Sequence, residues 1–301
     1  MLNISRYQNW TKKRLMDHAR LAYGVNSLLG RIGANPKIDK NGKLNVLTLP
    51  LHLAPHKLSG HNVCASATIG CSNACIHYAG NPAYMPQKQK SRIARTRLYF
   101  ANRALFIEIL RREIKALLRR ATVLDMRPAV RLNATSDIKF EFVRYDIGNG
   151  KELTLFSEFP QLQLYDYTKH SNRKNLPANY HLTFSLAEDN HLKAIEAFNN
   201  GFNIAVVFDT KRGQALPEQF TIDAGNGLKI SAPVFDGDYT DYRPSDKRGI
   251  IGLRAKGKAR HDKTGFVNYG GARHCVVNIG QAAPFEFIGG NWPESQKKVS
   301  A

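Results

Sequence analysis

Short apolar segments recur along this chain, and most of them end in a cluster of polar residues. The candidate β-strands are residues 43–53, 128–133, 162–170, 180–186, 203–210, 232–238, 249–257 and 274–280. Helical stretches separate several of them, such as residues 187–201, where Gly201 ends the helix. Strands that are apolar throughout are typical of a parallel sheet buried on both faces. The sequence therefore predicts an α/β fold.

The number of candidate strands favours a (β/α) barrel-like fold, complete or incomplete, over an open doubly wound sheet. We expect a single barrel-like domain over residues 43–290, preceded by a basic helical extension over residues 1–42. The last residues, 291–301, have the composition of a flexible tail. In barrels of this kind the functional residues gather at the carboxyl ends of the strands.

Three of the four cysteines lie in one polar loop, "CASATIGCSNACIHYA", directly after the first candidate strand. The loop is too rich in Gly, Asn and Ser for the thiols to be simple core residues. Its C-x6-C-x3-C spacing predicts that Cys64, Cys71 and Cys75 bind either zinc or a [4Fe–4S] cluster with one open iron. The candidates for a fourth zinc ligand are His77, His61 and Cys275.

The net charge of +20 indicates a partner rich in phosphate, because basic surfaces bind nucleic acid by releasing its counterions. Residues 88–120 have helical periodicity and many basic side chains, which predicts one amphipathic helix with a basic outer face. We expect DNA rather than RNA as the partner. The residues of this helix expected to contact phosphates are Arg111, Arg112, Arg119 and Arg120.

The sequence carries no sign of membrane insertion or secretion. No apolar run approaches the length of a membrane span, and the charged N-terminus lacks the apolar centre of a signal peptide. We therefore expect a cytoplasmic protein without membrane partners, in a compartment where thiols stay reduced.

Charged residues follow several strands and are candidates for a reactive site. Asp137, Asp236 and Asp238 could act as nucleophile or general base, although Asp137 could instead cap a helix. Three basic residues at the same rim, suited to binding phosphate or carboxylate, are Lys169, Arg254 and Lys256.

Several segments together resemble one known family. They include "GCSNACIHYAG", "RLNATSDIKFE", "LYDYTKH", "FDGDYTDYR" and "IIGLRAKGKARHDKTGFV", in this order between about Leu47 and Val267. The series is similar to the phage domain family called gene product 88, which is also found in plasmids. That family usually has a tyrosine shortly after the third cysteine, where this chain has Ile76 and then Tyr78. The resemblance implies a mobile-element origin and work on DNA in the host cytoplasm.

Three functions fit these features. The first is DNA base exchange, as in phage relatives of tRNA-guanine transglycosylase, with Asp137, Asp236, Asp238 and Lys169 as catalytic residues. The second is radical chemistry on nucleic acid with a [4Fe–4S] cluster and S-adenosylmethionine, since radical enzymes of that type carry three cysteines after the first strand. Their usual spacing is C-x3-C-x2-C. The third is a zinc-stabilised DNA-binding protein for replication or protection, without catalysis.

Overall fold

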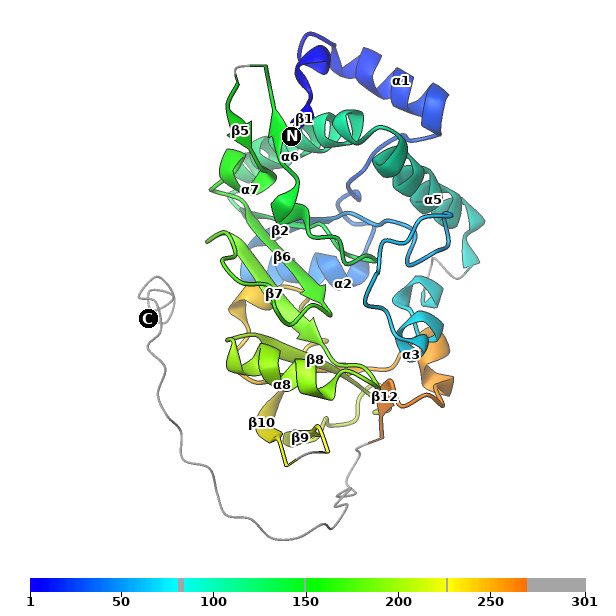
Figure 1. Ribbon diagram of the computed structural model, residues 1–301, viewed down its shortest axis with the longest axis vertical. Helices are drawn as coiled ribbons and strands as arrows, with labels where there is room; N and C mark the ends of the chain where they lie inside the picture. Colours follow the sequence, from blue (N-terminus) through cyan, green and yellow to red (C-terminus); the bar gives the residue numbers. More distant parts are fainter. Residues whose placement is uncertain (81–83, 149, 226, 270–301) are drawn as a thin grey trace.

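The structure is a computed structural model that describes residues 1–80, 84–148, 150–225 and 227–269 (Figure 1). Its α-helices are α1 (Lys12–Tyr23), α2 (Pro36–Asp39), α3 (Ile69–Asn73), α5 (Pro86–Ala101), α6 (Arg103–Val123), α7 (Leu155–Glu158) and α8 (His191–Asn199). Short 3-10 turns are η1 (Ser5–Tyr7), η2 (Lys40–Leu44), η3 (Ile76–Tyr78), η4 (Phe140–Phe142), η5 (Arg243–Ser245) and η6 (Gly257–His261). The candidate strand 274–280, Cys275 and the tail 291–301 lie outside the described residues.

Most strands belong to one large sheet. Its members are β2 (Val46–Pro50), β3 (Arg127–Arg131), β6 (Gln163–Thr168), β7 (Tyr180–Ser185), β8 (Asn203–Phe208), β9 (Gln219–Asp223), β10 (Lys229–Asp236), β11 (Ile250–Arg254) and β12 (Val267–Asn268). A small second sheet contains β1 (Leu2–Asn3), β4 (Tyr145–Asp146) and β5 (Glu152–Leu153). The seven apolar segments predicted as strands within the described residues each overlap a strand of the large sheet, which confirms the α/β class.

The strands of the large sheet run β2-β3-β6-β7-β8-β11-β10-β9 from edge to edge, and β12 also pairs with β8. All pairings are parallel except that of β9 with β10. Closure into a barrel is not seen among the described residues, where no pairing joins β2 to β9. At the far edge, β10 pairs with the free side of β11 and forms an antiparallel pair with the preceding strand β9, which is the last strand in this order.

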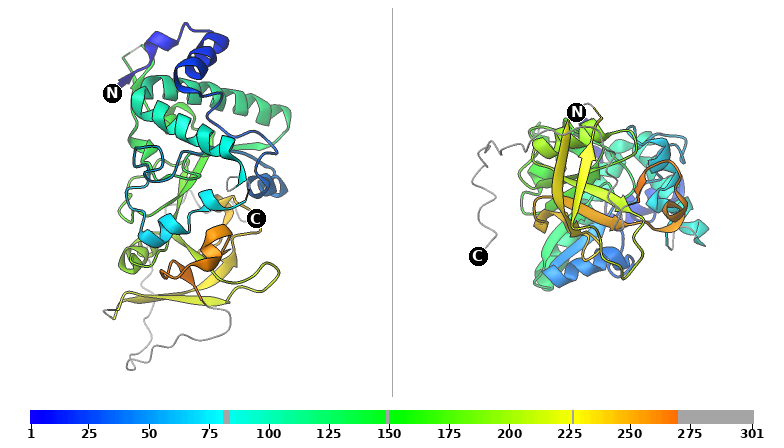
Figure 2. Two further views of the ribbon diagram at one scale, coloured as in Figure 1. Left: turned by 90° about the vertical axis from the view of Figure 1, so that its right-hand side faces the viewer. Right: turned by 90° about the horizontal axis from the view of Figure 1, so that it is seen from below.

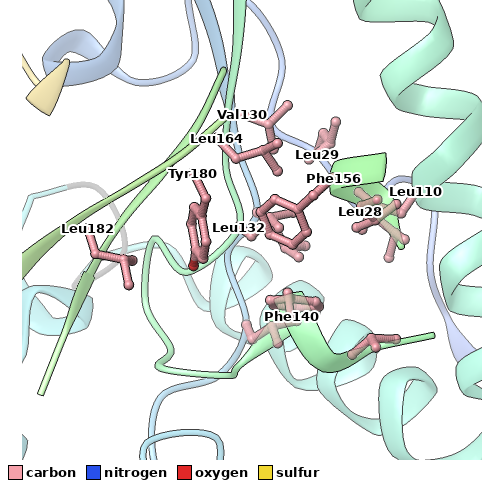
Figure 3. Close-up of a cluster of buried hydrophobic side chains, with 14 of the residues drawn as sticks. Leu28, Leu29, Leu110, Val130, Leu132, Phe140, Phe156, Leu164, Tyr180 and Leu182 are labelled. Carbon is pink, nitrogen blue, oxygen red and sulfur yellow. The ribbon is translucent and has the colours of Figure 1, made fainter. Parts of the chain in front are cut away.

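One face of the large sheet is apolar and is covered by helices. Alternate residues of successive strands, such as Val130, Leu164 and Leu182, belong to the main hydrophobic cluster together with Leu110 of α6 (Figure 3). Leu15 and Ala19 of α1 belong to the same cluster. Residues 1–42, predicted as an extension, therefore contribute directly to the main core.

The opposite face of the sheet is polar, and we call it the polar face. Its side chains include Thr48, Arg131, Tyr165, Tyr167 and His181. Residues 36–45 and 237–246 lie across this face, joined by a hydrogen bond from the Asp241 amide to Asn41 Oδ1 at 2.8 Å. The two sequence-distant segments thus close over the same strands.

A buried ion cluster holds this polar face together. The fully buried Asp241 carboxylate is 3.0 Å from Arg131 Nη1 and 3.5 Å from Lys37 Nζ, and it accepts a hydrogen bond from Tyr165. Burial opposes ionisation of Asp241, but Arg131 and Lys37 together hold its pKa below the ordinary value. The polar face is therefore stabilised by charge pairing together with a small apolar cluster of Val46, Ala129, Tyr165 and Tyr242.

The predicted single helix over residues 88–120 is wrong, because the segment folds as two helices. It breaks at Asn102, whose extended backbone ends α5 and whose side chain caps α6 by accepting the Leu105 amide at 3.0 Å. The same side chain also donates to the Tyr7 hydroxyl at 3.0 Å. The break lets α5 and α6 cross at an angle over the sheet (Figure 1).

Candidate functional site

A cavity of about 230 Å³ opens at the carboxyl ends of the parallel strands. All three loop cysteines line it: Cys64, Cys71 and Cys75. The charged residues around it, drawn from the ends of different strands and from α2, are Lys37, Arg131, Asp137, Lys169, Asp238, Arg254 and Lys256. The structure therefore brings the cysteine loop and most of the predicted strand-end charges to one place.

The cysteine loop is fixed in part by α3, the short helix that carries Cys71. Thr68 caps this helix by accepting the Cys71 amide at 3.0 Å. Glu188, from the segment after β7, accepts the Gly70 amide at 2.6 Å and the Thr68 hydroxyl at 2.8 Å. A side chain at Gly70 would collide with Glu188 and Thr264, so only glycine permits this close contact.

The segment after β11 forms a second wall for the loop. In Figures 1 and 2 the cyan α3 lies beside the orange residues near the end of the described chain. Gly257 has φ +55°, and a Cβ there would lie 2.7 Å from the Tyr78 carbonyl. The Lys258 ammonium is 4.2 Å from the centre of the Tyr78 ring. The loop is thus clamped between residues that are far from it in sequence.

The three thiols are free and partly buried. Burial raises the pKa of Cys64 to about 12 and that of Cys75 to about 11. Among the described residues no group of three or more His, Cys, Asp or Glu side chains is close enough to hold a single metal ion. The donor set itself, three soft sulfur atoms on one cavity, has the chemistry of an iron–sulfur or zinc site.

The two candidate fourth ligands within the described residues do not line the cavity. His77 is fully buried, with Nδ1 at 2.7 Å from Arg92 Nη1 and, among the residues that the structure describes, no hydrogen-bond partner at Nε2. Burial and the neighbouring Arg92 lower the pKa of His77 to about 4. The ring of His61 stacks on Phe100, with 4.2 Å between centroids. Cys275 lies outside the described residues.

Asp137 does not cap a helix. It precedes only the short turn η4, and its Oδ2 accepts the Lys169 amide at 2.8 Å. Arg173 Nη1 lies 3.8 Å from Oδ1. The carboxylate therefore ties the end of β3 to the end of β6 at the edge of the cavity.

Lys169 is a buried cation without an ion pair among the described residues. Its side chain lines the cavity although the residue is only 8% exposed. Nζ donates to Ser185 Oγ at 2.8 Å and lies 5.6 Å from the centre of the Phe266 ring. Because neutral oxygens are its only bonded partners here, Lys169 is suited to receive an anionic group in the cavity.

The charges after β10 and β11 pair with each other. Asp238 accepts Lys256 Nζ at 2.6 Å and lies 3.5 Å from Arg254 Nη1. Burial opposes ionisation of Asp238, but Lys256 and Lys37 hold its pKa below the ordinary value. Asp236 is not among the residues that line the cavity, and its half-exposed side chain pairs with Arg254 at 3.0 Å.

The predicted phosphate contacts of the α6 arginines need a correction. Arg111 is buried between Glu108 and Glu158, and its side chain is only 3% exposed. Arg112 pairs with Glu108 and donates to main-chain carbonyls of the N-terminal segment. Both guanidinium groups are held by partners within the protein, so they stabilise the fold instead of forming a free basic surface.

Arg119 and Arg120 are exposed but lie away from the cavity. Helix α6 ends at Val123, just before β3 begins at Arg127. Its last turn is therefore at the amino ends of the strands, the opposite edge of the sheet from the cavity. The structure does not bring these two arginines together with the site.

Comparison with known proteins agrees with the sequence motifs. The family model described as Gene product 88 matches residues 26–270, which is most of the chain. The chain belongs to the gene product 88 family. No curated protein and no solved structure matches it. Among the residues that the structure describes, no helix combines the length and apolar character needed to cross a bilayer.

Several residues of this gene product 88 site were not predicted. Lys37, Arg131 and Tyr167 reach the cavity from the polar face, and strand alternation indicates Arg131 and Tyr167 only once that face is known. Glu188 follows β7 and would have been found by applying the strand-end rule to every strand. The sequence around Lys37 did not indicate that this residue lines the cavity, because its position depends on the fold of residues 36–45.

Proposed function

We propose that this gene product 88 protein is a nucleic-acid-modifying enzyme that carries an iron–sulfur cluster on Cys64, Cys71 and Cys75. The observation that supports this most is the shared cavity. Three thiols from the loop after β2 line the same space as cations and carboxylates from the ends of β3, β6, β10 and β11. A metal centre there would face directly into a charged binding space.

The geometry favours a cluster over a single zinc ion. A structural zinc site needs four protein ligands close to one ion, whereas a cluster is larger and separates its thiolates further. Three cysteines line the cavity, and neither His77 nor His61 lines it with them. Three thiolates would leave one iron open toward the cavity.

The position of the cysteine loop in the fold also favours a cluster over a zinc ion, by analogy with enzymes of another family. The cysteine loop follows β2, the first strand of the parallel series β2-β3-β6-β7-β8-β11. This is where radical enzymes that use S-adenosylmethionine carry their cysteines. A cluster with an open iron supplies the electron that such enzymes need for radical chemistry.

The protein's own residues would bind and orient the substrate. Within the described part of the chain, Lys169 offers an ammonium that no carboxylate neutralises, which suits a phosphate or carboxylate group. The Asp238–Lys256 pair also lines the cavity and offers both an acceptor and donors. The net charge of +20 suits a nucleic-acid substrate, because it favours phosphate binding over the whole surface.

DNA base exchange is the second candidate, because Asp137 and Asp238 both line the cavity. In that reaction a carboxylate attacks the anomeric carbon while a second one assists. Asp137 already accepts a main-chain hydrogen bond through Oδ2, which leaves only Oδ1 for such a role. A zinc-stabilised DNA-binding protein without catalysis is the third candidate, and it shares the zinc requirement of the second.

Metal analysis after anaerobic purification tests the proposal. We expect a brown protein with about four irons per chain and an equal amount of sulfide. Each of Cys64→Ser, Cys71→Ser and Cys75→Ser should lose most of the iron. Cys275→Ser is the matched control and should keep it.

Two results would count against the cluster. One bound zinc and no iron would overturn it and favour base exchange or the non-enzymatic function. Full iron retention in all three loop variants would show that the loop is not the ligand set.

A further inference from the structure

A second and larger depression adjoins the cysteine loop. It has a volume of about 550 Å³, and we call it the loop groove. Its walls come from α3 and the residues around it on one side and from the segment after β11 on the other. Ala74 lines both the loop groove and the cavity described above, so the two spaces are neighbours.

The loop groove is lined by cationic and hydrogen-bonding side chains. Lys258 and Lys263 are exposed there, and two histidines, His56 and His261, lie beside them. The Lys258 ammonium is held over the Tyr78 ring rather than by a carboxylate. The positive charge of the loop groove is therefore available to a ligand.

Among the described residues that line the groove, one carboxylate, that of Asp262, is turned toward the main chain. Asp262 is buried, and its Oδ2 accepts the Val267 amide at 3.0 Å. Its Oδ1 accepts the Thr264 hydroxyl at 2.7 Å. Asp262 thus shapes the turn that presents Lys263, and its oxygens are occupied by internal donors.

We propose that the loop groove binds the phosphate backbone of a single DNA strand and delivers one base to the neighbouring cavity. The proposal rests on the proposed function, since it assumes a nucleic-acid substrate. Lysines and small polar side chains such as Ser72, Asn73 and Thr264 are the groups that usually contact phosphate oxygens. A single strand fits best, because chemistry on a base requires that base to leave the stack.

The location agrees with the electrostatics of the site. A strand in the loop groove would run beside the cysteine loop, where Lys258 and Lys263 line the same depression as Ser72 and Asn73. The exposed arginines of α6, Arg119 and Arg120, are at the other edge of the sheet. The loop groove is therefore better placed than α6 to hold DNA near the cavity.

Salt-dependent binding of a short fluorescein-labelled single-stranded DNA tests this. The double variant Lys258→Gln/Lys263→Gln removes two charges from the loop groove. Arg119→Gln/Arg120→Gln removes two equally exposed charges from α6 and is the matched control. For the groove variant we expect the slope of log affinity against log salt to fall by about 0.7 per lost phosphate contact. The α6 variant should keep the slope of the unchanged protein.

Two further measurements separate this inference from the proposed function. Iron content should be unchanged in the single variant Lys263→Gln, because Lys263, unlike Lys258, is not part of the clamp that holds the cysteine loop. Duplex DNA of the same sequence should bind more weakly than the single strand. An unchanged slope in the groove variant, equal losses in both double variants, or tighter binding of the duplex would each overturn the assignment.

Discussion

At the residue scale, Asp166 is a carboxyl group in an environment that disfavours its charge. It is fully buried on β6 and accepts the Asn133 amide at 2.6 Å and the Tyr180 hydroxyl at 2.9 Å. Burial raises its pKa from the ordinary 3.8 to about 7, although the hydrogen bonds and nearby Arg131 oppose this shift. Its proton therefore binds more tightly in the folded chain than in the unfolded chain.

This shift predicts how folding stability depends on pH. The stabilising contribution of the Asp166 proton is fully present below the unfolded pKa near 3.8 and is lost as pH rises through about 7. Asp166→Asn removes the titration and keeps the size of the side chain. Urea unfolding at a series of pH values should show wild type losing stability relative to Asp166→Asn between pH 4 and 7. Parallel curves for the two proteins would contradict the assignment.

At the element scale, the α5–α6 break is set by one side chain. Asn102 caps α6 and also bonds to Tyr7 of the N-terminal segment. Asn102→Ala should lower the free energy of unfolding by about 1 kcal/mol, because the cap is lost. Asn102→Asp keeps a capping oxygen and should stay close to wild type. Urea denaturation of the three proteins checks this, and an alanine variant of equal or greater stability would mean that the break needs no cap.

The strands were predictable from the sequence, and the helix break was not. A segment that is almost entirely apolar, such as residues 203–208, must be buried on both faces of a sheet. The continuous run of apolar residues alone therefore identifies β8. Helix α5 ends at Asn102 because this residue caps the next helix. No Gly or Pro stands there to indicate a helix break from the sequence. The barrel was expected because strands were counted, but strand counting does not show that β9 and β10 form a hairpin.

Arg111 shows why charge patterns mislead within an element. Its basic neighbours suggested a solvated face, whereas the structure buries it with two glutamates. Glu108 lies one helical turn away and could have been recognised as a partner. Glu158 comes from α7 and is brought near only by the folded core.

At the scale of the whole molecule, the candidate site is assembled from distant parts of the chain. Parallel strands present their carboxyl ends on one edge, and this rule correctly predicted that Asp137, Lys169, Asp238 and Lys256 meet. The rule could not supply Lys37, which reaches the cavity from α2 across the polar face. It also failed for Asp236, whose side chain pairs beside the cavity instead of lining it.

Glu188 is expected to position the cysteine loop from a distance. Its carboxylate holds the first turn of α3 through the Gly70 amide and the Thr68 hydroxyl. Under the cluster proposal, Glu188→Gln should lower iron affinity about tenfold, as loss of a supporting contact does at other metal sites. Asp189→Asn, at the exposed neighbouring position, is the matched control. Iron retained after a chelator challenge measures the effect, and equal retention in both variants would exclude a positioning role.

The residues that clamp the cysteine loop come much later in the sequence than the loop itself. This separation affects the order in which the parts of the site are synthesised. From β3 to β8, each strand of the large sheet pairs with the strand of that sheet that precedes it in the chain. This part of the sheet can therefore form in the order of translation. The thiols emerge early, yet Glu188, Gly257 and Thr264 leave the ribosome much later. A nascent chain would therefore expose three reduced cysteines without the walls that fix them. Under the cluster proposal, insertion of the metal centre would be a late step of biogenesis that takes place on a nearly complete chain.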